Sequence, residues 1–108
     1  MKPICENALQ IIENNDAKSW TKQLHPECSE EMCDLKQLRK ALAEVGIPKE
    51  GDWKVGPQIG YREQSRDGNK RIAVSYQVTK AGKPYVVKII YLSDSDGEGI
   101  FRLSVGIG

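Results

Sequence analysis

The chain has 108 residues, of which 39% are apolar and 29% are charged, and its formal net charge is +1. This length predicts one domain with one core, and the apolar share is too high for a disordered chain. The near-zero net charge excludes a strongly basic or acidic protein, so the overall charge favours no class of partner.

The apolar runs and the cysteines indicate the cellular compartment of the protein. No window reaches the ~18 apolar residues of a membrane helix, and the N-terminus lacks the apolar run of a signal peptide. The three cysteines, Cys5, Cys28 and Cys33, are an odd number and lie in the first third of the chain. Free thiols are typical of a reducing compartment, so we expect a cytoplasmic protein without membrane contact.

Residues 1–46 carry helical patterns. Pro3 suits the first turn of a helix that ends near residues 14–16, and Asp16 can cap a second short helix that Pro26 ends. Ser29 or Asp34 can cap a third helix that ends before Gly46. Apolar residues recur at helical spacing along these segments: Cys5, Ala8, Leu9 and Ile12, then Ala17, Trp20 and Leu24, then Met32, Leu35, Leu38, Leu42 and Val45.

Residues 51–108 carry strand patterns separated by turns. Asp67-Gly68 and Ala81-Gly82 suit two-residue hairpin turns, and Ser95-Asp96-Gly97 suits a three-residue loop. These turns predict strands near 54–64, 70–79, 84–92 and 100–107. We therefore predict an α+β fold of one domain (1–108), in which two or three N-terminal helices (1–46) pack on one face of a four-stranded antiparallel β-meander (51–108).

The turns also predict which residues face each other across the sheet. If each turn has the expected length, the facing pairs all consist of apolar or aromatic residues. The predicted pairs are Tyr61–Val74, Ile59–Tyr76, Val78–Tyr85, Tyr76–Val87, Val74–Ile89, Ile72–Tyr91, Ile89–Leu103, Val87–Val105 and Tyr85–Ile107. This shared apolar face should be the one that the helices cover.

The opposite face combines cations, small residues and some apolar area. Its predicted rows are Arg62-Ala73-Ile90-Arg102, Gly60-Ser75-Lys88-Ser104 and Gln58-Gln77-Val86-Gly106, and none of them holds a carboxylate. Leu92 and Ile100 add to the apolar area of this face. We take Arg62, Ser75, Lys88, Ile90, Arg102 and Ser104 as the candidate binding site, since Arg and Lys hold carboxylates and phosphates. The alternatives are a merely solvated face, or one partly covered by the N-terminal segment.

Other constellations give weaker signals. Cys5, His25, Cys28 and Cys33 are zinc-ligand types, but a lone C-x4-C spacing is a poor match to zinc sites, and whether these residues bind a metal stays open. His25 with Cys28 lacks an orienting acid for nucleophilic catalysis, and a surface histidine is the simpler interpretation. The carboxylates near the last turn, Asp94, Asp96 and Glu98, resemble part of a calcium loop, yet a hairpin explains Asp and Gly without an ion.

These observations favour a protein that binds a macromolecule over an enzyme. The first hypothesis is a small inhibitor or immunity protein that recognises a bacterial or phage protein through the open face, with no cofactor and no catalytic residue. The alternative is a metal-independent ribonuclease toxin or RNA-binding protein, with Arg62, Lys88 and Arg102 around the phosphate and Tyr61, Tyr76 or a serine nearby. The weakness of the alternative is the general base, because the open rows hold no histidine or carboxylate. A third possibility is a subunit that completes an assembly through an outer strand.

Overall fold

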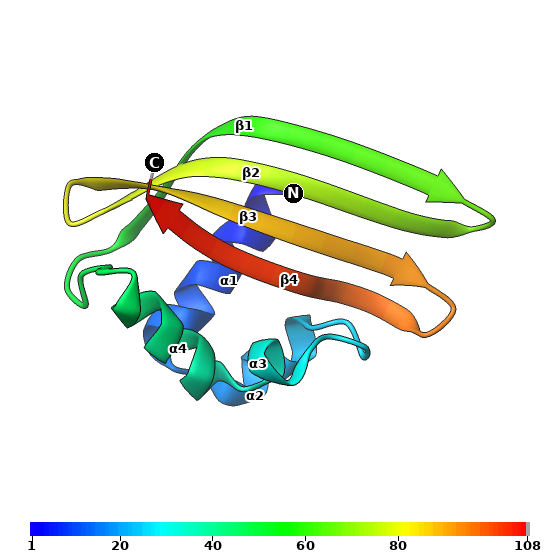
Figure 1. Cartoon of the computed structure of the whole chain (residues 1–108), viewed down its shortest axis with the longest axis horizontal. Coiled ribbons are helices and arrows are strands. Elements are labelled where there is room, and N and C mark those ends of the chain that lie inside the picture. The colour runs from blue at the N-terminus through cyan, green and yellow to red at the C-terminus, as the bar shows by residue number, and fades with distance from the viewer. Residues whose placement is uncertain (108) are drawn as a thin grey trace.

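In the computed structural model, which describes residues 1–107, four helices precede a four-stranded antiparallel sheet (Figure 1). The elements are α1 (Lys2–Asn14), α2 (Ala17–Gln23), α3 (Glu30–Cys33), α4 (Leu35–Glu44), β1 (Trp53–Arg66), β2 (Asn69–Lys80), β3 (Lys83–Asp94) and β4 (Gly97–Ile107). The strands follow one another in the order β1-β2-β3-β4. The predicted α+β fold with an antiparallel meander is thus confirmed. Within residues 1–107, no helix is long and apolar enough to cross a membrane.

The helices begin and end at the residues that the sequence marks for this. The Asp16 carboxylate caps α2 by accepting a hydrogen bond from the Ser19 N–H (3.2 Å). The predicted third helix is split, because Ser29 precedes α3 and Asp34 caps α4 by accepting from the Lys36 N–H (3.0 Å). Val45 ends the third apolar pattern and was expected to be buried with it, which is wrong: α4 ends at Glu44, and Val45 is 38% exposed.

The predicted registers hold across the middle of the sheet. Every predicted β2–β3 pair is present, as are Tyr61–Val74 between β1 and β2 and the pairs from Ile89–Leu103 onward between β3 and β4. Asp67 and Gly68 adopt the positive φ values (51° and 81°) that the first turn requires. Alternation of side chains then places one set of residues toward the helices and the other toward the opposite surface.

The start of β1 departs from the prediction. Gln58, and not Ile59, lies opposite Tyr76, with register shifts on both sides of it. Pro57 lies within the first of these shifts, between Val55 and Gln58, and has no N–H to donate to a strand ladder. As a result Ile59 is 54% exposed and not part of the core.

The last hairpin distributes its residues differently from the expected three-residue loop. Its turn has two residues, Ser95 and Asp96, because Asp94 pairs with Gly97. The additional residue lies instead at Phe101, where a bulge separates the Tyr91–Ile100 pair from the Ile90–Arg102 pair. Ile100 therefore points to the core and is 1% exposed, which corrects its predicted place on the open face.

The core lies between the sheet and the helices. In Figure 1, α1 lies behind the sheet, so the face turned to the viewer is free of helices. The buried residues are largely aliphatic and come mainly from the four helices and from the helix-facing side of all strands except β1. Towards the two hairpin tips on the right of Figure 1 the strands extend beyond the helices, which agrees with Tyr61 being 50% exposed. Ile107, predicted to face the core, is 79% exposed.

Candidate functional site

The open face brings the candidate residues together as the registers predict. Arg62 lies opposite Ala73, Ala73 opposite Ile90, and Ile90 opposite Arg102, so one row crosses all four strands. The neighbouring row, Gly60-Ser75-Lys88-Ser104, is also present. The third predicted row is incomplete, because Gln58 is displaced opposite Tyr76, and its amide oxygen lies 3.5 Å from the Tyr76 hydroxyl.

The two rows surround a shallow hollow of about 410 Å³. The candidate residues Arg62, Ser75, Lys88, Ile90, Arg102 and Ser104 all line it. At the β1 side Gly60 has no side chain, and a Cβ at this position would make only an ordinary contact (3.5 Å) with the Ser75 hydroxyl oxygen. The residues at the centre are small, so an approaching group can reach the strands between the long cationic side chains.

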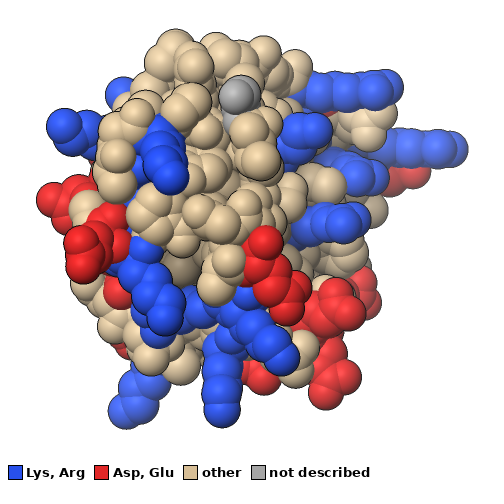
Figure 2. Space-filling view, turned by 60° about the vertical axis from the view of Figure 1, so that its left-hand side comes forward, with Lys and Arg blue, Asp and Glu red and all other residues tan. Residues whose placement is uncertain are grey.

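The charge of the hollow has one sign. Arg62, Lys88 and Arg102 are exposed, and among residues 1–107 none of them forms an ion pair with a carboxylate. Neither row contains Asp or Glu. In Figure 2 the open face is turned to the right, and Lys and Arg side chains project in a group along the upper right margin at the height of the strands. The backbones of Arg62 and Arg102 are three strand spacings apart, about 14 Å, so these cations suit a distributed set of anions better than one small ion.

The tyrosines considered for phosphate chemistry do not face the hollow with their hydroxyls. Tyr76 is 3% exposed, and its hydroxyl lies beside the Gln58 side chain. The Tyr61 hydroxyl donates to the Glu63 carboxylate (3.2 Å), and both residues face the helix side of the sheet. Of the residues that the structure describes, none in the two rows is a histidine, a carboxylate or a tyrosine that could act as a general base.

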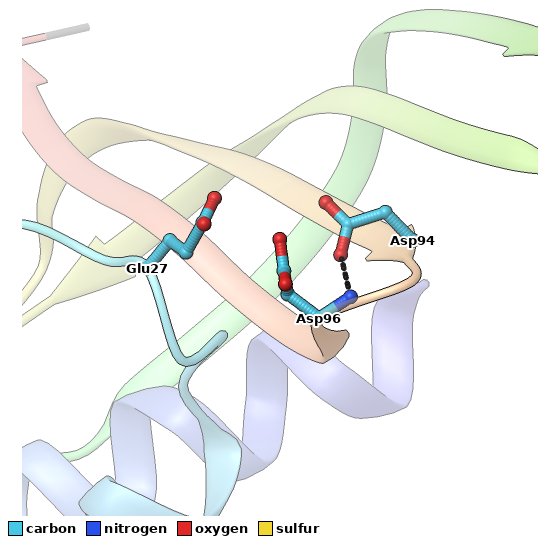
Figure 3. A group of neighbouring side chains, drawn as sticks. All are labelled: Glu27, Asp94 and Asp96. Atoms are coloured by element: carbon cyan, nitrogen blue, oxygen red, sulfur yellow. Dashed lines mark hydrogen bonds between the residues drawn. The ribbon is translucent and has the colours of Figure 1, made fainter.

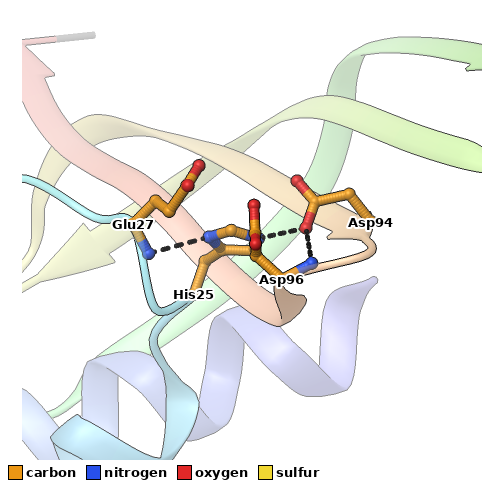
Figure 4. Close-up of polar contacts among 4 residues, drawn as sticks. All are labelled: His25, Glu27, Asp94 and Asp96. Atoms are coloured by element: carbon orange, nitrogen blue, oxygen red, sulfur yellow. Dashed lines mark hydrogen bonds and ion pairs between the residues drawn. The ribbon is translucent and has the colours of Figure 1, made fainter.

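His25 occupies a position that the sequence did not predict. It is fully buried, which corrects the expectation of a surface histidine. Its Nδ1 accepts a hydrogen bond from the Glu27 N–H (3.0 Å), so Nε2 carries the proton and donates to the Asp94 carboxylate (2.9 Å). This imidazole holds the pKa of Asp94 below its usual value. Figure 4 shows the ring between the loop after α2 and the end of β3, so its two hydrogen bonds hold these segments together.

Three carboxylates lie close together beside His25. Glu27, Asp94 and Asp96 each offer an oxygen, and these oxygens lie within 4.8 Å of one another (Figure 3). Glu98, named with the two aspartates as a possible calcium ligand, instead accepts a hydrogen bond from the Tyr91 hydroxyl (2.6 Å). The hydrogen bond and like charge of Asp96 raise the pKa of Glu27. Oxygen ligands of this kind suit Ca²⁺, but Asp94 is already bonded to His25 and to the Asp96 N–H, so the group also serves to close the hairpin.

The cysteines do not form the metal site considered from their spacing. Cys28 and Cys33 form a disulfide across α3, which corrects the expectation of free thiols. Cys5 is fully buried in the face of α1 that meets the core, and burial raises the pKa of its thiol to about 11. His25 is committed to Asp94 and Glu27. Since a disulfide sulfur is not a thiolate ligand, these residues are not available together as a zinc site.

Comparisons with known proteins add no identity: no family model, no curated protein and no solved structure matches this chain.

Proposed function

We propose that this protein is a binding protein that recognises an acidic surface of a partner protein through the open face of its sheet. The proposal is carried by one observation: the hollow of this face is lined by three exposed cations without a facing carboxylate in its rows. Cations left unpaired on a surface are ready to pair with an incoming anionic group, and such complementarity sets association rate and specificity.

The composition of the face favours a protein over a nucleic acid. Ile90, Leu92 and Val86 are half-buried and lie among the charged and small residues of the open side. Arginine beside apolar area is typical of protein interfaces. Proteins that bind single-stranded nucleic acids stack bases on aromatic side chains. The two rows contain no aromatic residue among those described, and Tyr61, which also lines the hollow, belongs to the helix side of the sheet.

Binding without chemistry is the mode of action of an inhibitor or immunity protein, which acts by covering the surface of its target. We place this protein in that functional class on the absence of a general base in the described rows. The cytoplasmic location expected from free thiols loses its basis, because two of the three cysteines are paired. The proposed function therefore specifies no cellular compartment.

The test is capture of a partner from an extract of the source cells. Wild-type protein is compared with the triple variant Arg62→Gln, Lys88→Gln and Arg102→Gln. A matched control removes the same charge from the helices through Lys18→Gln, Lys22→Gln and Lys36→Gln, all exposed positions. We expect an acidic protein that wild type and control retain and that the open-face variant loses. Equal retention by all three proteins would refute the proposal.

Incubation with labelled total RNA, at low and at moderate salt, tests the alternative. Retention that falls steeply with salt and is lost in the open-face variant would identify the face as an RNA site instead. Cleavage lost in the same variant would identify a ribonuclease. The proposed function predicts neither retention at moderate salt nor cleavage.

A further inference from the structure

The two outer strands of the sheet differ in how their free edges are protected. β1 is protected by Pro57, by two register shifts and by the charged residues Lys54, Arg62 and Arg66. Prolines, bulges and charges are the means by which proteins prevent a further strand from adding to an edge. The edge of β1 is thus unsuited to binding another chain.

β4 carries a bulge at Phe101 and a charge at Arg102, but no proline, bulge or charge protects its second half. The run Leu103–Ile107 contains neither a charge nor a proline. Among residues 1–107, backbone pairing reaches the outer edge of β4 at one place, where Leu24 forms a parallel bridge with Ile100 and the His25 N–H donates to the Ile100 carbonyl (2.9 Å). From Phe101 to Ile107, no strand among residues 1–107 pairs with this edge. An unprotected edge exposes backbone donors and acceptors that an extended segment can satisfy.

A groove runs beside this edge. Its volume is about 890 Å³, and it is bounded by β4 on one side and by α3 and α4 on the other. Apolar side chains contribute much of the lining: Met32, Leu38, Ala41, Leu42 and Val45 from the helical side, and Phe101, Leu103 and Val105 from β4. The β4 residues that line it, 101–105, span about 17 Å when extended, the length of a segment of about five residues.

The helices beside the groove limit what can bind along β4. Because α3 and α4 bound the groove opposite β4, a segment added along β4 would lie between strand and helix. A second copy of this chain would have to bring its own α4 into the same space when its β4 paired with this one. An extended segment from a different protein meets no such obstacle.

Charge defines the chemistry of that segment. Arg102 lines both the groove and the hollow of the open face, and it forms no ion pair within the described chain. The helical side carries both signs, with Glu31, Glu44 and Lys40. Side chains of an added strand alternate between the two faces, so those beside Leu103 and Val105 would meet apolar surface and one beside Arg102 would meet a cation.

We propose that the edge of β4 binds an extended segment of the partner protein by strand addition, with apolar side chains toward the groove and an acidic side chain beside Arg102. This inference deepens the proposed function and rests on it, because the added strand would extend the open face across Arg102. The partner would thus be held by backbone hydrogen bonds along β4 and by the cations of the open face.

Selection from displayed random peptides of about seven residues tests the inference, since this length covers the edge. We expect wild-type protein to enrich peptides that alternate apolar and acidic residues. Ala41→Tyr, at an exposed position of α4 that lines the groove, should weaken their binding by about tenfold or more. Lys36→Tyr, at an exposed position of the same helix outside the groove, should leave binding unchanged.

Two further measurements make the result specific for strand addition. N-methylation of alternate peptide amides should abolish binding, and hydrogen exchange should slow at backbone amides of residues 102–107 when the peptide is bound. The inference is wrong if no peptide is enriched, if Ala41→Tyr binds as wild type does, or if protection appears away from β4. The double variant Arg62→Gln and Lys88→Gln separates the two proposals, because neither residue lines the groove: it should keep peptide binding even if it loses the partner.

Discussion

Lys80 provides a sharp test of the packing, because its ammonium group is almost completely buried. The residue is 4% exposed, and its Nζ donates to the Glu13 carboxylate (2.7 Å) and to the Lys49 carbonyl (3.4 Å). The ammonium also lies 5.2 Å from the centre of the Trp53 ring. Glu13 is 28% exposed, so the two partners differ in how easily each can reach water once the other is removed.

This difference predicts an asymmetric cost. Glu13→Gln leaves a buried cation without its counter-charge, and we expect it to lower the free energy of unfolding by about 2–3 kcal/mol, since the Lys49 carbonyl and the Trp53 ring offset part of the loss. Lys80→Met fills the same space with an apolar side chain and leaves a carboxylate that can be hydrated. We expect it to cost only about 0–1 kcal/mol.

Urea unfolding followed by far-UV circular dichroism gives both values and that of the double variant. The double variant should resemble Lys80→Met, because removing the carboxylate costs little once the cation is gone. The reasoning would be refuted if Lys80→Met were the more destabilising of the two single changes.

Three further predictions concern other parts of the fold. The imidazole of His25 lowers the pKa of Asp94, so this residue stabilises the fold above its unfolded-state pKa, and the stabilisation is lost as the pH falls through its folded-state pKa. Asp94→Asn should therefore make the free energy of unfolding less dependent on pH in this acidic range. Replacing both Cys28 and Cys33 by Ser removes a loop closed over a sequence separation of 5, and should lower the free energy of unfolding by about 2 kcal/mol in urea titrations. Val74→Ala, on the buried face, should cost about 1–3 kcal/mol, whereas Ser75→Ala on the open face should change it by less than about 0.5 kcal/mol; equal costs would mean that the faces are misassigned.

Much of the sheet could be predicted because its signals are local and mutually consistent. Asp67-Gly68 marks a turn by residue type, and the alternation of β2 and β3 allows one register only. The last hairpin shows the limit of this reasoning. A three-residue turn, and a two-residue turn followed by a bulge at Phe101, give the same pairing from Arg102 onward, so the pattern could not separate them or place Ile100.

The contacts around His25 could not be predicted because they join distant parts of the chain. His25 and Asp94 are 69 residues apart, and neither belongs to a sequence motif that predicts a contact with the other. The disulfide was not predicted for a different reason: an odd number of cysteines requires only one free thiol, and here Cys28 and Cys33 pair while Cys5 lies in the core. The irregular start of β1 could have been predicted from Pro57, since proline cannot donate to a strand ladder, but the predicted Ile59–Tyr76 pair did not allow for it.

The most direct test of the central claim is site-specific photo-crosslinking. A photoreactive residue is placed at Ser75, within the hollow of the open face, and in a control protein at Lys18, exposed on α2. We predict that an acidic protein from the source extract is crosslinked at position 75 and not at position 18, and that the crosslink is lost when Arg62, Lys88 and Arg102 are changed to Gln. Crosslinking at position 18 alone, or a crosslink at position 75 that survives loss of the cations, would contradict the account.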